Sequence, residues 1–298
     1  MERILHYKIS KEDENKTIAS FLEKAGYSGQ NIINLKKIPE SILLNGKWEY
    51  VTKKLAEGDM LTIHIVEDTS SEKIPPVKLP FPVVYEDEDI VVVNKPADMP
   101  IHPSMNNYEN TLGNAAAYYF AEKGQPFVFR CINRLDRDTT GLTILAKHML
   151  SSSILNEDML HRRIKRTYYA IVVGEDLPDE GVIDAPIGRK EGSTIERMVD
   201  FENGERAVTH YKVLERKKGK ALVALNLETG RTHQIRVHMK YIGHPLIGDF
   251  LYNPECKLME RQALHSYRLE FTHPITKEEM VFVAPLPEDM AEGFEKEL

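Results

Sequence analysis

The feature that most constrains this fold is a series of strand patterns that follow one another directly along the chain. Apolar and polar residues alternate over residues 165–174, which is the period of a strand with one buried face. Residues 181–189, 206–214 and 220–228 continue the series as further strands, with turns between them. Strands joined by short turns pair in antiparallel fashion, so we expect this part of the chain to build an antiparallel sheet.

Hairpins and helices extend the pattern. Residues 83–94 hold two β-branched runs around an acidic turn, and residues 268–283 hold a second expected hairpin. Thr111 is placed to cap an amphipathic helix, an apolar strand covers residues 142–146, and a helix is expected over residues 149–162. The sequence therefore predicts an α+β fold with a large, mainly antiparallel sheet and flanking helices.

The N-terminal region has a smaller pattern of its own. An amphipathic helix is expected over residues 11–26, and Ser28 is placed to cap a second, short helix. Asn45-Gly46 between apolar flanks indicates a hairpin, and an alternating strand follows at residues 60–65. Helices and strands in so short a stretch indicate a separate small α/β unit.

A proline-rich stretch separates the two patterns. Residues 67–80 are polar and then rich in proline, a composition that gives a stiff and extended linker. We therefore expect a small domain over residues 1–66 and a larger one over residues 81–298. The length of 298 residues fits about two domains of ordinary size.

Composition narrows the class of protein. Hydrophobic residues make up 42% and charged residues 29% of the chain, which is typical of a globular protein. Cys131 and Cys256 show no metal-ligand spacing, which fits a reducing cytosol and argues against a disulfide framework. No signal peptide and no run of roughly 20 apolar residues is found, so we expect a soluble cytoplasmic protein.

Charge is distributed unevenly along the chain. The net charge is −7, but residues 130–240 contain 20 Lys and Arg against 16 Asp and Glu. The densest basic clusters are residues 161–166 and 216–220. Because a nucleic-acid partner needs a locally positive face rather than a positive total, this pattern permits RNA without requiring it.

Three polar residues are not explained by the predicted fold alone. Asp136 lies between Arg134 and Arg137 on a loop that enters a strand, so fixed positive charge would keep its carboxylate ionised and oriented. Tyr168 is in a strand with apolar neighbours, and Arg231 stands at a turn that opens a helix. If these segments converge, a carboxylate, a phenol and a guanidinium line one pocket. An ion pair that only fixes a loop is the alternative for Asp136.

The helix after Arg231 is expected to have Thr232 as its cap. Arg231, Gln234 and His238 would then share one helical face. A metal site is not expected, because His233 and His238 point in different directions on a helix and no H-E-x-x-H motif is present.

Other reaction classes fit less well. Asp136 and Asp138 stand two residues apart on one loop, which suits poorly the paired carboxylates that flank a sugar in glycosidases. Neither G-x-G-x-x-G nor G-K-[ST] occurs, so a phosphate-cradling nucleotide site is not expected. His265 and His273 are expected to be structural.

The stretch from Arg134 to Leu142 resembles a family signature. Arg134-Leu135-Asp136 with Thr139-Thr140-Gly141-Leu142 is similar to the H-R-L-D-x-x-T-S-G-L signature of RluA-type RNA pseudouridine synthases. Further matching segments occur in the family's order: Asn94–Ala97 with His102-Pro103, Lys165–Val172, Thr229–His238, Gly243–Pro245 with Gly248-Asp249, and Leu264-His265 with Phe271–Pro274. The resemblance covers residues 81–290, and residues 1–66 resemble the S4 RNA-binding fold, a usual companion of this catalytic domain.

This resemblance implies the pseudouridine-synthase fold, with the active site in a cleft across a mixed sheet, and isomerisation of uridine in RNA. It makes Asp136 the catalytic aspartate, Tyr168 the residue stacked on the target base, and Arg231 the partner that holds the aspartate. The other residues expected at the substrate are Lys95, His102, Arg134, Arg137, Thr140, Gln234 and Ile235. No cofactor or metal is expected, because reactant and product differ in neither charge nor redox state.

Two departures from the family pattern bear on the choice of substrate. Asn133 replaces the signature histidine, and Asp98 replaces a glycine in a loop where a positive φ is expected, which Asp tolerates better than most residues. The expected partner is ribosomal RNA, with transfer RNA as the alternative, and a monomer is expected. A catalytically inactive RNA-binding or ribosome-assembly factor and a hydrolase of nucleosides or sugars are the alternative functions.

Overall fold

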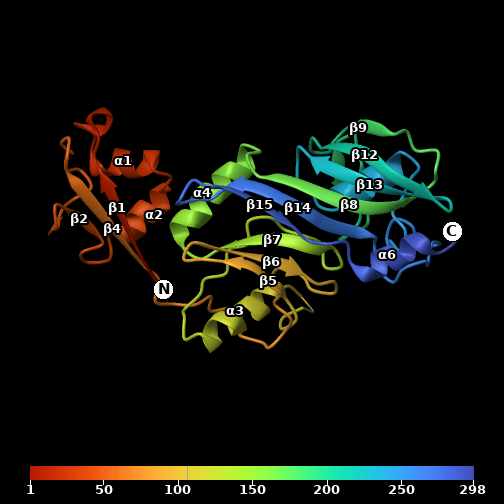
Figure 1. Ribbon diagram of the computed structural model, residues 1–298, viewed down its shortest axis with the longest axis horizontal. Coiled ribbons are helices and arrows are strands. Elements are labelled where there is room, and N and C mark those ends of the chain that lie inside the picture. The colour runs from red at the N-terminus through yellow and green to blue at the C-terminus, as the bar shows by residue number, and fades with distance from the viewer. Residues whose placement is uncertain (106) are drawn as a thin grey trace.

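The structure is a computed structural model that describes residues 1–105 and 107–298. Its strands form a four-stranded sheet near the N-terminus, a nine-stranded central sheet and a separate two-stranded hairpin. Figure 1 shows an elongated molecule with the N-terminal sheet at one end and the long central sheet through the rest. Within the described ranges, no helix has the length and apolar character needed to span a membrane.

The N-terminal unit, residues 1–66, pairs a sheet with two short helices. Its elements are β1 (Glu2–Lys8), η1 (Lys11–Asp13), α1 (Ile18–Lys24), α2 (Gly29–Leu35), β2 (Ile42–Leu44), β3 (Lys47–Trp48) and β4 (Met60–Val66). The strand order is β1-β4-β2-β3, and every pair is antiparallel. Ser28 caps α2, and Asn45 and Gly46 close the β2–β3 hairpin with positive φ, both as predicted.

The single helix predicted over residues 11–26 is replaced by a 3₁₀ turn and a shorter α-helix. Asn15 interrupts it, since its φ is 65° and its N–H donates to the Leu55 carbonyl at 2.8 Å. A left-handed residue cannot continue a right-handed helix, so α1 begins afresh with Thr17 as its cap.

The proline-rich segment lies against the larger domain rather than free of it. Residues 67–80 contain no helix or strand. The hydroxyls of Ser70 and Ser71 accept hydrogen bonds from the N–H groups of Phe127 and Phe129 at 3.1 and 2.9 Å. These contacts fix the course of the segment along the domain that follows.

The central sheet and its helices account for most of the remaining chain. The elements are β5 (Val83–Glu86), β6 (Ile90–Lys95), α3 (Leu112–Glu122), β7 (Thr140–Ala146), α4 (Met149–Leu160), β8 (Lys165–Val173), β9 (Glu180–Asp184), β10 (Ile187–Arg189), β11 (Arg197–Val199), β12 (Val208–Lys217), β13 (Lys220–Leu227), α5 (Gln234–Tyr241), β14 (Leu264–Thr272), β15 (Glu279–Val283) and α6 (Glu288–Glu295). The sheet runs β5-β6-β7-β14-β8-β13-β12-β9, and β15 also pairs with β14. Only the short β7–β14 pairing is parallel among the described strands, which confirms the predicted α+β class with a mainly antiparallel sheet.

Helices cover both faces of the sheet at β6 and β7. Val91 and Val93 of β6 share a core cluster with α3, whereas Ile90 and Val92 share one with Leu155 of α4. Successive strand residues point to opposite faces, so α3 and α4 lie on opposite sides of β6. This explains why β6 is a continuous apolar run rather than an alternating one.

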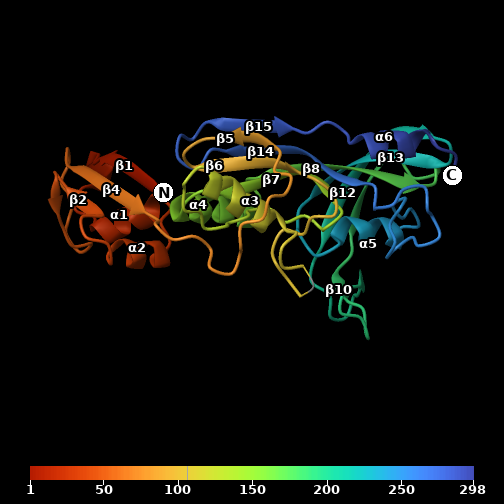
Figure 2. The ribbon, with the colours of Figure 1, turned by 90° about the horizontal axis from the view of Figure 1, so that it is seen from below.

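The C-terminal half of the sheet carries α5 and a small hairpin. Ile235 and Met239, one turn apart on α5, pack in a cluster with residues of β8 and β13. Figure 2 shows the β10 region projecting away from the sheet beside α5. The single strand predicted over residues 181–189 is divided into β9 and β10, whereas β11, β1 and α6 are elements that the sequence patterns did not predict.

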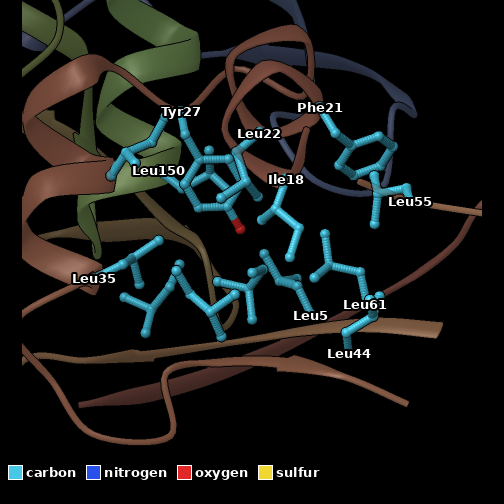
Figure 3. Close-up of a cluster of buried hydrophobic side chains, with 14 of the residues drawn as sticks. Leu5, Ile18, Phe21, Leu22, Tyr27, Leu35, Leu44, Leu55, Leu61 and Leu150 are labelled. Carbon is cyan, nitrogen blue, oxygen red and sulfur yellow. The ribbon is translucent and has the colours of Figure 1, made fainter. Parts of the chain in front are cut away.

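A residue of α4 completes the core of the N-terminal unit. Leu150 is fully buried in one cluster with Leu22, Tyr27 and Leu35. Figure 3 shows Leu150 beside Tyr27 and Leu22, reaching in from α4. Because Leu155 of the same helix packs on the central sheet, α4 joins the two cores.

Candidate active site

A cleft of about 990 Å³ opens beside the loop that precedes β7. Its walls come from that loop, the C-terminal end of α4, the start of β8 and the segment from the end of β13 into α5. Six lysine and arginine side chains and three carboxylates line it, although the whole chain carries a net charge of −7. The cleft is therefore locally suited to a polyanion.

Asp136 lies in this cleft with about a quarter of its side chain exposed. Its Oδ2 accepts a hydrogen bond from Nη1 of Arg236 at 3.1 Å, and its Oδ1 makes no hydrogen bond to any residue that the structure describes. One oxygen is thus anchored and the other is free to meet a ligand, as a catalytic carboxylate requires.

The loop that carries Asp136 is fixed from below. The Asn133 side chain donates to the Leu142 carbonyl at 3.0 Å and accepts from the Ile144 N–H at 2.9 Å. Asn133, which stands where the family signature has histidine, therefore pins the loop to β7 instead of facing the cleft. Asp98 has a φ of 53°, so this loop does adopt the left-handed conformation expected for that position.

Lys95 supports the same loop from the interior. Its fully buried Nζ donates to the carbonyls of Pro96, Met99 and Arg137 at 2.8, 2.9 and 2.8 Å. Burial lowers the pKa of Lys95 to about 7, although the nearby carboxylates of Asp138 and Asp136 oppose the shift. Lys95 does not line the cleft, so the substrate contact expected for it is replaced by a structural role.

Arg236 connects Asp136 to a second carboxylate. Its Nε and Nη2 donate to Asp249 at 2.7 and 2.8 Å, and Asp249 is fully buried. Burial disfavours the charge on Arg236, but the hydrogen bonds and negative charges of Asp249 and Asp136 together outweigh burial and raise the pKa of Arg236 above its ordinary value. The guanidinium is therefore a fixed cation held between two carboxylates.

Arg231 does not hold Asp136. Its guanidinium pairs with Glu205 and donates through Nε to the carbonyl of Arg206 at 3.1 Å, at the exposed rim of the cleft. The helix expected after Thr232 begins at Gln234, because His233 precedes it with a left-handed φ of 58°. Arg231 therefore lies outside the helix, and the prediction that it holds Asp136 is wrong. Arg236, in the first turn of α5, occupies the place beside Asp136.

Tyr168 forms the apolar wall next to the carboxylate. It lies on β8 and is only 4% exposed. Its ring shares a core cluster with Leu135, Ile235 and Leu264, and all four residues line the cleft. The predicted convergence of Asp136 and Tyr168 and the pocket position of Ile235 are thus seen in the geometry.

His233 is a site residue that the sequence reasoning missed. Its Nε2 lies 3.9 Å from Oδ2 of Asp136, and its Nδ1 is 2.9 Å from the Tyr252 hydroxyl. Burial lowers the pKa of His233, while the Asp136 carboxylate opposes the shift, so the ring is mainly neutral at pH 7. Two sequence signals could have indicated it: it lies two residues after Arg231, and it belongs to the Thr229–His238 segment that resembles the family.

The remaining predicted substrate residues divide into two groups. His102 and Arg134 line the cleft, and burial with the nearby Arg134 charge lowers the pKa of His102. Thr140 hydrogen-bonds to His265 at 2.8 Å and lies outside the cleft. Arg137 points away as well, and it pairs with Asp138 at 3.0 Å.

Gln234 lines the cleft, but its side-chain amide hydrogen-bonds to neighbouring protein groups. Its Nε2 donates to the Val208 carbonyl and to the Thr209 hydroxyl, both at 3.0 Å, and its Oε1 accepts from Thr229 at 2.7 Å. His238, which was expected on the same face, is buried against Thr209 and the Ala185 carbonyl. Gln234 therefore fixes the start of α5 against β12.

One group of side chains outside the cleft has the spacing of metal ligands. Asp87, Asp89 and His273 bring one ligand atom each within 4.8 Å of one another. Their oxygens already accept hydrogen bonds from Arg3, His148 and the His273 ring. This donor set is satisfied by protein cations and N–H groups, so it does not fit an additional metal ion.

Comparisons with known proteins agree on one family. Residues 89–241 match the family described as RNA pseudouridylate synthase. The chain is 40% identical over 275 residues to the uncharacterized RNA pseudouridine synthase YjbO of Bacillus subtilis, a match that covers 92% of this chain and 97% of the relative. It is 38% identical over 269 residues to ribosomal large subunit pseudouridine synthase D of Vibrio cholerae, covering 84% of this chain and 81% of that protein.

A solved structure supports the same assignment. Human RNA pseudouridylate synthase domain containing 1 aligns with a TM-score of 0.59 and 26% identity, covering 71% of this chain and 85% of that chain. Together with the sequence matches, this shows that the chain belongs to the RNA pseudouridine synthase family, isomerases that convert uridine in RNA to pseudouridine.

Proposed function

We propose that this enzyme isomerises a uridine of ribosomal RNA and that Asp136 is its catalytic carboxylate. The position of Asp136 carries the proposal, since one carboxylate oxygen is anchored by Arg236 while the other is free beside Tyr168. The Vibrio cholerae relative is a ribosomal large subunit enzyme, which supports ribosomal RNA over transfer RNA. We also propose that it acts in the cytoplasm, where ribosomal RNA would be modified, and that it acts as a monomer.

The residues of the cleft have complementary tasks in this reaction. The target uridine leaves its stack, and its base rests on Tyr168, whose apolar surroundings favour a desolvated ring. Asp136 starts the reaction at the ribose or the base. The bond from N1 to C1′ breaks, the uracil turns, and C5 bonds to C1′; N1 gains a proton and C5 loses one. Arg236 is the positioning residue that holds the carboxylate through these steps.

The N-terminal unit is proposed as an S4-like RNA-binding domain over residues 1–66, joined by the 67–80 linker to a catalytic domain over residues 81–298. Trp48 and Tyr50 are both exposed, and their rings make an edge contact with centroids 4.6 Å apart. Exposed aromatic rings offer stacking surfaces for unpaired bases, and Lys53 and Lys54 add positive charge nearby in the sequence.

The test is a pseudouridine map of ribosomal RNA from a deletion strain complemented with variants. Wild type is expected to restore a specific pseudouridine, whereas Asp136→Asn restores none because the anchored carboxylate is lost. Asp138→Asn is the matched control, since Asp138 lies on the same loop but outside the cleft. It should retain activity within severalfold.

A purified-enzyme assay on transcribed large-subunit ribosomal RNA separates the alternatives. A retained rate in Asp136→Asn would refute the assignment of the carboxylate. Growth rescue by Asp136→Asn without any modification would favour an inactive assembly factor. Release of free uracil would identify a hydrolase instead.

A further inference from the structure

Arg166 is a cation of the cleft whose side chain has no partner among the described residues. No carboxylate pairs with it among the described residues, and its buried Nε makes no hydrogen bond to them. Arg162 and Arg206, in contrast, each form an ion pair with Glu228, at 3.2 and 3.1 Å. No described carboxylate neutralises the charge of Arg166, so this charge is available to an anionic ligand in the cleft.

The geometry places Arg166 on the outward side of the base site. Arg166 and Tyr168 are two residues apart on β8 and both line the cleft, about 7 Å apart along the strand. Burial decreases from Tyr168 to the exposed Lys165, so Arg166 is nearer to solvent than the aromatic ring. The deep, apolar position beside Tyr168 is therefore suited to the target base. The charged RNA backbone that carries this base would then lie toward Arg166.

The other side of the guanidinium is open because Gly230 has no side chain. A Cβ at Gly230 would lie 3.7 and 3.8 Å from Nη1 and Nη2 of Arg166. Both terminal nitrogens therefore lie over bare backbone at the cleft wall. An anion can approach them there without displacing a side chain.

We propose that Arg166 binds a phosphate next to the target nucleotide, so that the RNA backbone passes over Gly230 while the base stacks on Tyr168. This rests on the proposed function. The planar guanidinium matches two phosphate oxygens with two parallel hydrogen bonds, which a lysine cannot reproduce. Arg166 is thus a substrate-binding residue that fixes the position of the nucleotide relative to Asp136.

Arg166→Ala and Arg166→Lys test this, with Arg163→Ala as the matched control. Arg163 is three residues away, pairs with Asp158 at 2.6 Å and lies outside the cleft. Two probes are used: oligouridylate for equilibrium binding at several salt concentrations, and transcribed large-subunit ribosomal RNA for kcat/KM. We expect Arg166→Ala to lower affinity and kcat/KM by at least about tenfold and to reduce the salt slope by about 0.7. Arg166→Lys should keep the slope but lose part of the affinity, and Arg163→Ala should match wild type.

An RNA modification makes the test independent of any effect on folding. A neutral methylphosphonate replaces the phosphate on either side of the modified uridine in a short RNA. If Arg166 contacts that phosphate, the replacement slows wild type but has little further effect on Arg166→Ala. The proposal would be overturned if the methylphosphonate, at either position, slowed Arg166→Ala by the same factor as wild type. It would also be overturned if Arg166→Ala and Arg163→Ala bound oligouridylate equally well. A wild-type enzyme that leaves ribosomal RNA unmodified refutes the proposed substrate instead, while oligouridylate binding still tests Arg166.

Discussion

At the scale of single residues, two arginines five positions apart occupy opposite environments. Arg231 is 41% exposed and pairs with Glu205 at the rim of the cleft. Arg236 is 3% exposed and lies between Asp136 and Asp249. An exposed ion pair contributes little to stability, whereas removing one partner of a buried pair leaves an uncompensated charge.

Arg236→Gln is expected to reduce both stability and activity. The buried Asp249 loses its cation, which should lower the free energy of unfolding by about 3–5 kcal/mol. Asp136 loses its anchor, so kcat should fall more than KM rises. Urea unfolding and single-turnover isomerisation measure the two effects. Arg231→Gln is the control and should change stability by less than about 1 kcal/mol. The reverse ranking of the two variants would show that Arg231 holds the aspartate during the reaction.

Sequence reasoning placed the carboxylate and the aromatic ring but assigned the wrong arginine. Asp136 is flanked by charge in a fixed motif, and Tyr168 interrupts an apolar strand, so both are visible as local patterns. The start of α5 depends on a non-glycine residue, His233, with a φ of 58°. Such a conformation is rare and has no sequence signal, so the face on which each arginine lies could not be predicted.

At the scale of elements, the active-site loop depends on the parallel junction of β7 and β14. Gly141 is at this junction with a φ of 109° and pairs with Ser266. A Cβ at Gly141 would lie 2.6 Å from the Ser266 nitrogen, and the Ser266 carbonyl oxygen would be closer still. Only glycine lets the two strands approach this closely, directly after the loop that carries Asp136.

Gly141→Ala is therefore expected to destabilise the protein strongly. Backbone strain and the clash with Ser266 together should cost at least about 3 kcal/mol, measured as a shift in urea midpoint at constant slope. Gly192→Ala is the matched control, because its φ is 74° but no atom lies within 4 Å of the added Cβ. It should cost only about 1–2 kcal/mol from backbone conformation. Equal losses in the two variants would mean that the junction relaxes to admit the methyl group.

Elements with strong periodicity were predictable, and short or terminal ones were not. β8 and β13 match the expected ranges closely, and β12 and the β14–β15 hairpin overlap theirs. The three-residue strand β11 is too short to show a period, the predicted 181–189 strand is divided into β9 and β10, and β1 gains its pairing only from the distant β4. Pairing between distant segments is a tertiary effect that local patterns cannot reveal.

At the scale of the whole molecule, charge and packing hold the N-terminal unit against the catalytic domain. Arg3 donates to Asp89 at 2.8 and 3.1 Å, and the same carboxylate is 2.8 Å from the His148 ring. Leu150 of α4 packs into the N-terminal core (Figure 3). The sequence indicated an extended linker between two units, but long-range contacts such as Arg3 with Asp89 leave no local pattern to read. The relative position of the two units was therefore not predictable.

The carboxylate at this interface makes the docking dependent on pH. Burial raises the pKa of Asp89, but hydrogen bonds from His148 and Arg3 outweigh it, so the pKa is lower than in the unfolded chain. A carboxyl with a lowered folded-state pKa stabilises the fold above its unfolded value of about 4, and this contribution is lost as the pH falls further. Acid should therefore weaken the docking of the N-terminal unit.

Arg3→Gln is expected to separate the unfolding of the N-terminal unit from that of the catalytic domain. Trp48 is the only tryptophan and reports the N-terminal unit by fluorescence, whereas far-UV circular dichroism reports the whole chain. In wild type at pH 7 the two urea transitions should coincide. In the variant the Trp48 transition should occur earlier by about 1.5–3 kcal/mol, because two hydrogen bonds to a buried carboxylate are lost. Lowering the pH toward 3 should separate the transitions in wild type and add little in the variant.

Glu88→Gln provides the control for this prediction. Glu88 contacts the same Arg3 at 2.8 Å, but its side chain is 74% exposed. Its loss should move the Trp48 transition by less than about 0.5 kcal/mol, since solvent screens an exposed pair. Coincident transitions in Arg3→Gln at both pH values would show that the packing of Leu150 alone fixes the N-terminal unit. Separation in Glu88→Gln as well would mean that the net charge of the interface matters more than the buried contact. If the Trp48 transition shifts only in Arg3→Gln and in wild type at low pH, the coupling between the two units lies at Asp89.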